Sequence, residues 1–199
     1  MDMVTRQEVE AYLAAMYPDQ TPAAGVSPST IADVSARLAR YTGRQDWGGQ
    51  SERTEYHNGD SAFILTGYWP IVSVASIYDD TEHDFAAASL VAADEYFLMQ
   101  SKAGESNGVI AVDYMLTAGV QNVKVTYTGG YASATEIPAD LRRAAMMQIA
   151  YETQRQTPGR FVALPGSYNS SNTDGFEGTG LLGEVMLLAD RYKRGVPYA

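Results

Sequence analysis

Near the start of the chain, apolar side chains recur every three or four residues, as they do along an amphipathic helix. Thr5-Arg6-Gln7-Glu8 opens this segment and matches a capping box, in which the Thr and Glu side chains bond to each other's unpaired backbone amides. A second apolar stripe follows Pro28 and stops before Gly43, a residue that suits the left-handed conformation after a helix. These patterns predict helices at 5–17 and 28–41.

Helical spacing returns in the last third of the chain. Pro138 favours the first turn of a helix, because the N–H that proline lacks would be unpaired there in any case. The pattern predicts helices at 138–157 and 181–194. The polar side of the first of these is expected to hold Arg142, Gln148, Glu152 and Arg155.

Between these helices, from about 52 to 131, the pattern is that of strands. Asn58-Gly59 separates two short segments of strand-forming residues and is the dipeptide that best tolerates a tight hairpin turn. Residues 102–108 predict a looser hairpin, and the alternation of apolar and polar residues over 123–128 indicates a strand with one buried face. About five strands, most of them joined by short turns, predict an antiparallel sheet.

Taken together, these elements predict an α+β fold: a helical bundle of about four helices with an inserted antiparallel β-sheet. The stretch 165–180 is rich in Gly, Ser, Asn and Thr, which predicts a flexible linker. We therefore expect a folded body at 1–164 and, at 165–199, the linker followed by a C-terminal helix. A helix at the end of a flexible arm is suited to docking on a neighbouring protein.

The composition excludes several classes of protein. Of the 199 residues 45% are hydrophobic and none is cysteine, which excludes a disordered chain and any disulfide or thiolate chemistry. No apolar run approaches the roughly 18 residues of a membrane span, and Met1-Asp2-Met3-Val4 lacks the basic segment that opens a secretory signal. We expect a soluble protein that makes no membrane contact and stays where it is made.

Charge is distributed unevenly along the chain. Residues 1–141 hold 19 acidic and 7 basic side chains, whereas residues 142–199 hold 5 acidic and 7 basic ones. A nucleic-acid-binding protein normally presents a basic patch, so DNA that meets the bulk of this chain should slide past it. Solubility is the simpler alternative explanation of the acidity.

Three segments resemble motifs of catalytic or ligand sites in residue pattern but lack the structural context that those sites need. Ser106 lies in G-x-S-x-G, but a strand is predicted after it and both histidines precede it, so the segment is interpreted as a turn. Residues 178–183 match G-x-G-x-x-G without a strand directly before them or a βαβ unit after them. The acids at 79–84 fit no EF-hand spacing and predict a solvated turn. We expect no catalytic residue, no cofactor and no metal ion.

Two rival classes of function stay open at this point. One is a hydrolase that uses Ser106 or the acids at 79–84. The other is a monomeric ligand-binding β module, which would recognise a ligand such as carbohydrate through some of the 14 tyrosines.

Four segments carry a resemblance to a known family. They are the helix pair at 5–41, the strand Tyr68–Tyr78, the strand Val123–Tyr131 with the helix start Ile137–Ala144 behind it, and the closing segment Glu184–Arg194. In order and in pattern they resemble the head–tail connector, or adaptor, family of long-tailed bacteriophages and gene transfer agents.

The resemblance implies a structural virion protein without enzymatic activity, made in the cytoplasm of the bacterial host and built into the neck between head and tail. It implies a homo-oligomeric ring of twelve copies beneath the portal protein, which extends the DNA channel towards the stopper and tail-terminator proteins while DNA passes without specific binding. A stopper or tail-completion protein is the alternative within the virion. Docking on the portal or on a neighbouring subunit is expected to use Leu181, Leu182, Val185, Leu188, Arg191, Tyr192, Lys193, Arg194 and Tyr198.

Overall fold

The computed structural model describes residues 2–16, 25–155 and 180–194, and the chain divides into two compact units. Met1–Trp47 and Ala134–Arg191 form the first, which we call the helical unit, and Gly48–Ser133 with Tyr192–Ala199 form the second, the β unit. The predicted α+β class is therefore confirmed. The predicted boundary between body and linker, at 164 and 165, lies outside the described residues, as does most of the stretch 165–180.

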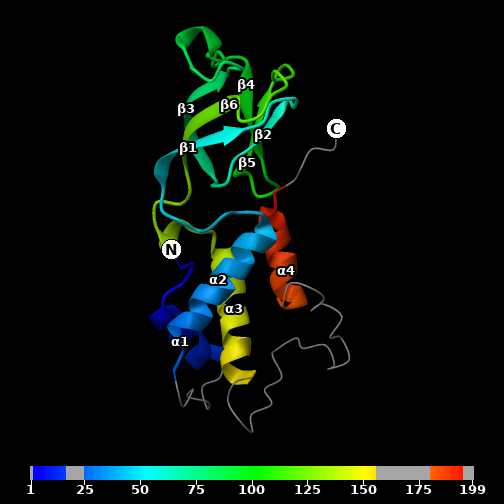
Figure 1. Ribbon diagram of the computed structural model, residues 1–199. Coiled ribbons are helices and arrows are strands. Elements are labelled where there is room, and N and C mark those ends of the chain that lie inside the picture. The colour runs from blue at the N-terminus through cyan, green and yellow to red at the C-terminus, as the bar shows by residue number, and fades with distance from the viewer. Residues whose placement is uncertain (1, 17–24, 156–179, 195–199) are drawn as a thin grey trace. The chain divides into compact units, whose positions relative to one another are not determined.

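Four α-helices lie in the described part of the helical unit (Figure 1). The third, α3, contacts each of the other three and is the centre of the unit. No helix among the described segments is long and apolar enough to cross a membrane. The helices are α1 (Arg6–Met16), α2 (Pro28–Thr42), α3 (Ala139–Arg155) and α4 (Gly183–Ala189), and a 3-10 turn, η4 (Asp190–Tyr192), follows the last of them.

The ends of the first two helices form as the sequence predicts. Thr5 N–H donates to Glu8 Oε2 at 2.7 Å, and Glu8 N–H donates to Thr5 Oγ1 at 3.3 Å, which is a complete capping box. Gly43 closes α2 with a φ of 83°, a left-handed conformation that glycine adopts without a steric penalty. The last helix is shorter than predicted, because α4 passes into the 3-10 turn at Asp190.

The β unit contains two antiparallel three-stranded sheets, where the sequence predicted one sheet of about five strands. One sheet has the order β1-β6-β3 and the other the order β2-β5-β4. Single 3-10 turns, η1 (Ala87–Ser89) and η2 (Ala134–Glu136), follow β3 and β6. The strands are β1 (Ser51–His57), β2 (Phe63–Leu65), β3 (Ile71–Asp79), β4 (Tyr96–Gln100), β5 (Ser106–Val112) and β6 (Val123–Gly129).

The hairpin predicted at Asn58-Gly59 is wrong, because this dipeptide joins the two sheets. Strand β1 pairs with β6 and strand β2 pairs with β5. Gly59 N–H instead donates to the carbonyl of Gly119 at 3.1 Å and to Asn122 Oδ1 at 2.9 Å. A Cβ at position 59 would lie 1.7 Å from the carbonyl oxygen of Thr117, so glycine is needed here for close backbone approach.

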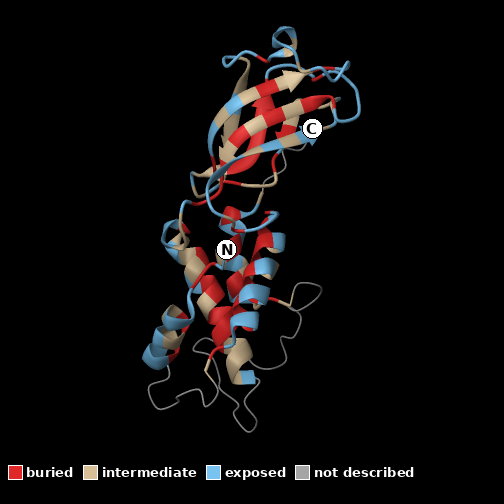
Figure 2. Ribbon diagram, turned by 60° about the vertical axis from the view of Figure 1, so that its left-hand side comes forward, coloured by how far each residue is buried: buried red, intermediate tan, exposed pale blue. Residues whose placement is uncertain are grey.

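The alternation over 123–128 and the looser hairpin at 102–108 are confirmed. Val123, Val125 and Tyr127 of the central strand β6 are fully buried, and the residues between them are half-buried. They share one apolar core with Ile110 of β5 and Ile77 of β3, so both sheets contribute to it (Figure 2). Strands β4 and β5 pair in antiparallel register, and the connection between them is shorter than predicted, because β5 already begins at Ser106.

Candidate functional site

The last helix, predicted as a docking element, has its apolar side inside its own chain. Leu181 and Val185 have no exposed surface, and Tyr192 is 7% exposed. Leu182, Leu188 and Arg194 are half-buried, and Tyr198 lies outside the described residues. Docking by this segment stays a prediction, and the predicted residues that lie on the surface are Arg191 and Lys193.

A buried amide on α3 holds the backbone that leads into this helix. Gln148 has no exposed surface, so its predicted place on the polar side of the helix is wrong. Its Nε2 donates to the carbonyl of Gly180 at 3.1 Å and to Glu152 Oε1 at 2.8 Å, and its Oε1 accepts from Leu182 N–H at 2.9 Å. The amide thus satisfies backbone groups ahead of a helix that has no side-chain N-cap.

Arg37 of α2 completes this arrangement. Its Nη1 donates to the carbonyl of Gly180 at 2.8 Å, and its guanidinium pairs with Glu152 and, at 3.0 Å, with Asp33. We call Arg37, Gln148 and Glu152 the polar clamp. They line a hollow of about 550 Å³ within the helical unit together with Asp33, Tyr151, Arg155 and Gly180.

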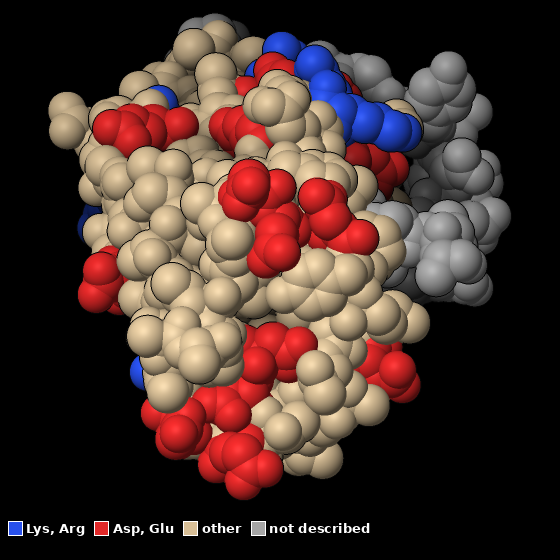
Figure 3. Space-filling view, turned by 90° about the horizontal axis from the view of Figure 1, so that it is seen from above, with Lys and Arg blue, Asp and Glu red and all other residues tan. Residues whose placement is uncertain are grey.

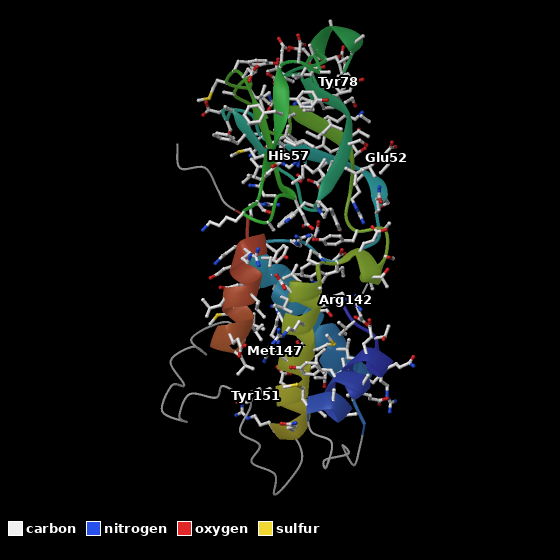
Figure 4. All side chains as sticks on the ribbon, turned by 180° about the vertical axis from the view of Figure 1, so that it is seen from behind. Glu52, His57, Tyr78, Arg142, Met147 and Tyr151 are labelled. Carbon is white, nitrogen blue, oxygen red and sulfur yellow. The ribbon has the colours of Figure 1, made fainter. Side chains whose placement is uncertain are left out.

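The clamp is a structural arrangement, because its charged groups pair with one another and with backbone. Glu152 accepts from both Arg37 and Gln148, so its carboxylate is held in place by two partners. Figure 4 labels Tyr151, Met147 and Arg142 on α3, the helix that carries Gln148 and Glu152 of the clamp. The sequence held a signal for Gln148: it follows Leu141 by seven residues and Ala144 by four, which places it on the apolar side of α3.

Surface contacts secure the far end of the last helix. The Tyr41 hydroxyl donates to Asp190 Oδ1 at 2.6 Å, and Arg191 Nη1 lies 3.0 Å from Asp140 Oδ2. Burial, and then the neighbouring Asp190 carboxylate, raise the pKa of Tyr41 to about 12, so its phenol stays a hydrogen-bond donor.

Arg194 belongs to the β unit, where it contacts the loop after β2. Its guanidinium donates to the carbonyl of Thr66 and lies 4.1 Å from the centre of the Trp69 ring. A Cβ at Gly108 would lie 2.7 Å from this ring, so the glycine lets Trp69 pack against β5. Arg194 is a predicted docking residue that is already engaged within the chain.

The Glu55 carboxylate, on the edge strand β1 of the sheet β1-β6-β3, also contacts the loop after β2. Glu55 accepts from the Tyr127 hydroxyl at 2.5 Å and from Gly67 N–H at 3.1 Å, and His57 Nε2 lies 3.2 Å away. Burial alone would raise the pKa of Glu55, but the interactions with His57, Tyr127 and Gly67 outweigh it and lower that pKa. Burial and Glu55 both raise the pKa of Tyr127.

The three motifs that matched chemical sites serve as local structure where they are described. Ser106 opens β5, so the turn interpretation is wrong for Ser106 itself, and the turn lies just before it; the Ser106 Oγ accepts from Gly108 N–H at 3.4 Å. Asp80 accepts from the backbone amides of Glu82 and Phe85, as an acid that fixes a turn does. No group of three or more possible metal ligands converges within the described segments. The glycines of 178–183 lie partly outside them.

Aromatic side chains do gather on the outer face of the sheet β1-β6-β3, as a ligand-binding β module would require. Tyr56, Lys124 and Tyr78 are paired across the three strands, and Phe85 contacts both tyrosine rings. The Lys124 ammonium occupies this group, 5.2 Å from the Phe85 ring and 5.7 Å from the Tyr78 ring. The aromatic group therefore already holds a cation of its own chain.

Comparisons with known proteins identify the family. The family model named head completion protein matches residues 2–163. A chain of the structure "Neck of empty GTA particle computed with C6 symmetry" is 18% identical, with a TM-score of 0.52 over 98% of this chain and 92% of that one. A chain of "Virion of native gene transfer agent (GTA) particle" is 16% identical, with a TM-score of 0.50 over 100% and 96%. A search of curated proteins found no match.

At these identities the two structures show a shared fold. The family match is stronger evidence, because it runs from α1 through both sheets to α3. It confirms the resemblance to head–tail connectors and agrees with the predicted place between head and tail. The chain belongs to the head completion protein family.

Proposed function

We propose that this chain is the head–tail adaptor of a bacteriophage or gene transfer agent particle. In this role copies of the chain form a ring in the virion neck, beneath the portal, and connect the head to the stopper and the tail. The observation that carries the proposal is the family match over residues 2–163, which includes α1 to α3 and both sheets. The fold shared with a chain of a gene transfer agent neck supports the same role.

The proposed role is structural, without a reaction. The polar groups described above support this, because Gln148, Glu55 and Asp80 each bond to backbone amides or carbonyls of the same unit. Groups arranged in this way hold loops and helix ends in place.

The charge of the β unit fits a wall past which DNA slides. Residues 48–133 hold 11 acidic and 3 basic side chains, and acidic groups dominate the face shown in Figure 3. Like charges repel phosphates, so such a surface lets DNA pass without retaining it.

Docking on the portal is assigned to the exposed basic end of the last helix. Arg191 and Lys193 are exposed, whereas Leu181 and Val185 are core residues of the helical unit. Deleting the whole helix would therefore disturb the fold as well as the docking. The double variant Arg191→Glu/Lys193→Glu tests docking without removing an apolar anchor. Because it also breaks the surface ion pair between Arg191 and Asp140, its thermal unfolding is compared with that of the wild type.

A gene deletion in the particle-producing bacterium tests the function. Without this chain we expect DNA-filled heads that lack tails, counted by electron microscopy, and we expect the wild-type gene supplied on a plasmid to restore tails. A plasmid that carries Val120→Ser, a change at a side chain 73% exposed, serves as the matched control and should also restore them. Normal numbers of tailed particles in the deletion strain would refute the proposal.

Binding to the purified portal distinguishes an adaptor from a stopper. An adaptor should bind the portal alone and co-migrate with it in gel filtration, and the Arg191→Glu/Lys193→Glu variant should lose this binding. A stopper or tail-completion protein should bind only after another neck protein is in place. That result would show that the chain is a stopper or tail-completion protein and not the adaptor.

A further inference from the structure

The chain contains two Asn-Gly pairs, Asn58-Gly59 and Asn107-Gly108. In such a pair the backbone nitrogen of the glycine is able to attack the side-chain carbonyl carbon of the asparagine, because glycine has no Cβ to obstruct the approach. The nitrogen forms a bond to Cγ, the bond from Cγ to Nδ2 breaks, and the side-chain nitrogen leaves as ammonia with the proton of the glycine N–H. A five-membered imide remains, which water then opens.

The two pairs differ in how the fold holds them. Asn107 is 3% exposed within β5, and its Oδ1 accepts from Val109 N–H at 3.1 Å. Asn58 is exposed and lies between β1 and β2. The pair at 107 therefore reacts only when a core strand comes apart, whereas the reaction of the pair at 58 depends on its local surroundings.

A neighbouring loop holds both reacting groups of the exposed pair. Asn58 Oδ1 accepts from Gln121 N–H at 2.9 Å, which fixes the amide side chain. Gly59 N–H donates to the carbonyl of Gly119 and to Asn122 Oδ1. The attack requires the Gly59 nitrogen to give up this proton and the two groups to turn toward each other. The loop 117–122, in the position that the structure describes, therefore opposes the reaction.

One carboxylate of β3 anchors this loop. Asp79 Oδ2 accepts from both the N–H and the hydroxyl of Thr117, at 2.8 and 2.9 Å, and Asp79 Oδ1 accepts from Asn122 Nδ2 at 3.2 Å. Residues 117–121 are exposed, so hydrogen bonds rather than apolar burial hold most of the loop. Segments of this kind open at a lower free energy than core strands do.

The main product of the reaction does not fit the closed loop. When water attacks the main-chain carbonyl carbon of the imide, the bond from that carbon to the Gly59 nitrogen breaks. The chain then continues through the former side chain as isoaspartate, and its backbone is one carbon longer. A single Cβ at Gly59 would already lie 1.7 Å from the Thr117 carbonyl oxygen, so the longer backbone has to displace the loop.

We propose that Asn58 is a site of spontaneous deamidation that the loop 117–122 controls. While Asp79 holds the loop closed, the Asn58-Gly59 pair is protected, and the pair reacts with water as the co-reactant when the loop opens. The inference goes beyond the proposed function and does not depend on it, since it concerns the chemical lifetime of the β unit.

Peptide mapping by mass spectrometry measures deamidation at both pairs in the full chain, kept at mildly alkaline pH with and without unfolding urea. In the folded protein we expect Asn58 to react at least about tenfold more slowly than in urea. Asp79→Ala should raise the rate at Asn58 in the folded protein about threefold or more and leave the rate at Asn107 unchanged. Asp113→Ala, which removes an exposed acid ahead of the same loop, is the matched control and should change neither rate.

Circular dichroism shows whether the Asp79→Ala protein is folded. If it is not, Thr117→Val, which removes only the hydroxyl donor, takes its place and should give a smaller acceleration confined to Asn58. Equal rates at Asn58 in the folded and the urea-unfolded protein would overturn the proposal. Equal acceleration at both pairs would show that unfolding of the whole unit controls the reaction, and no acceleration at Asn58 would show that the anchored loop does not. Either result would contradict the assignment.

Discussion

At the scale of single residues, buried polar groups determine where loops and helix ends lie. Gln148 has no exposed surface and makes three hydrogen bonds, two of them to the backbone at Gly180 and Leu182. A buried donor or acceptor left without a partner costs about 1–3 kcal/mol. The position of the last helix therefore depends on one amide of a different helix.

Replacing this amide should weaken the helical unit. Gln148→Leu leaves Leu182 N–H and the Gly180 carbonyl with one partner fewer, and we expect the free energy of unfolding to fall by about 2–4 kcal/mol. Urea denaturation followed by circular dichroism measures the change. Gln154→Leu, at a partly exposed position on the same helix, is the control and should change it by less than about 0.5 kcal/mol. Equal effects of the two variants would contradict the clamp.

Position 59 has room for glycine but not for a residue with a side chain. A methyl group at this position would meet the Thr117 carbonyl oxygen at 1.7 Å, so Gly59→Ala must move the backbone of a loop. We expect a loss of at least about 2 kcal/mol of unfolding free energy. Gly49→Ala is the control, because a Cβ there meets nothing within 4 Å. A Gly59→Ala protein as stable as wild type would show that the crossing between sheets differs from the one described.

The lowered pKa of Glu55 predicts that the stability of the fold depends on pH. Its pKa is lowered in the folded protein, so the carboxylate stabilises the fold at neutral pH, and this contribution disappears as pH falls below the ordinary value of 4.5. Glu55→Gln should therefore cost about 1–3 kcal/mol at pH 7 and less at pH 3. Urea titrations at both pH values test this. Glu52→Gln, exposed on the same strand, should have little effect at either pH. A Glu55→Gln cost that does not shrink at low pH would refute the assignment.

At the scale of elements, the last helix is a fixed part of the helical unit. Leu181 and Val185 are fully buried, and Tyr41 and Asp140 hold its far end through Asp190 and Arg191. The sequence showed an amphipathic helix but not what covers its apolar side. In the structure that side lies against α2 and α3.

Shortening a buried side chain of the last helix should show how strongly this helix is held in the helical unit. Leu181→Ala removes a fully buried side chain, and we expect a loss of about 2–5 kcal/mol. Leu187→Ala, two residues from the buried anchor Val185 and itself 71% exposed, should be close to neutral. Thermal unfolding of both variants gives the comparison. If Leu181→Ala were equally neutral, the helix would not be held in the helical unit.

Elements defined by local chemistry could be predicted from the sequence. The capping box at Thr5 and Glu8, the end of α2 at Gly43 and the alternation along β6 each depend on residues close together in the chain. Strand pairing could not be predicted from the sequence, because β1 pairs with β6, a strand about 70 residues away in the chain. Asn58-Gly59 was misassigned for this reason: its turn chemistry suits a hairpin, but its glycine is required by a loop distant in sequence.

At the scale of the whole molecule, the division into two units separates two kinds of surface. The β unit carries most of the acidic excess, since residues 48–133 hold 11 acidic and 3 basic side chains. Like charges repel phosphates, so in the proposed ring we expect the β unit to be the part of the chain that faces the DNA.

An electron cryomicroscopy reconstruction of the neck of the assembled particle would show directly whether this chain is the adaptor. We expect density for the chain in a closed ring between portal and tail, with both units recognisable in every copy. A neck reconstruction in which the chain is absent, or is present as a single copy outside any ring, would contradict it.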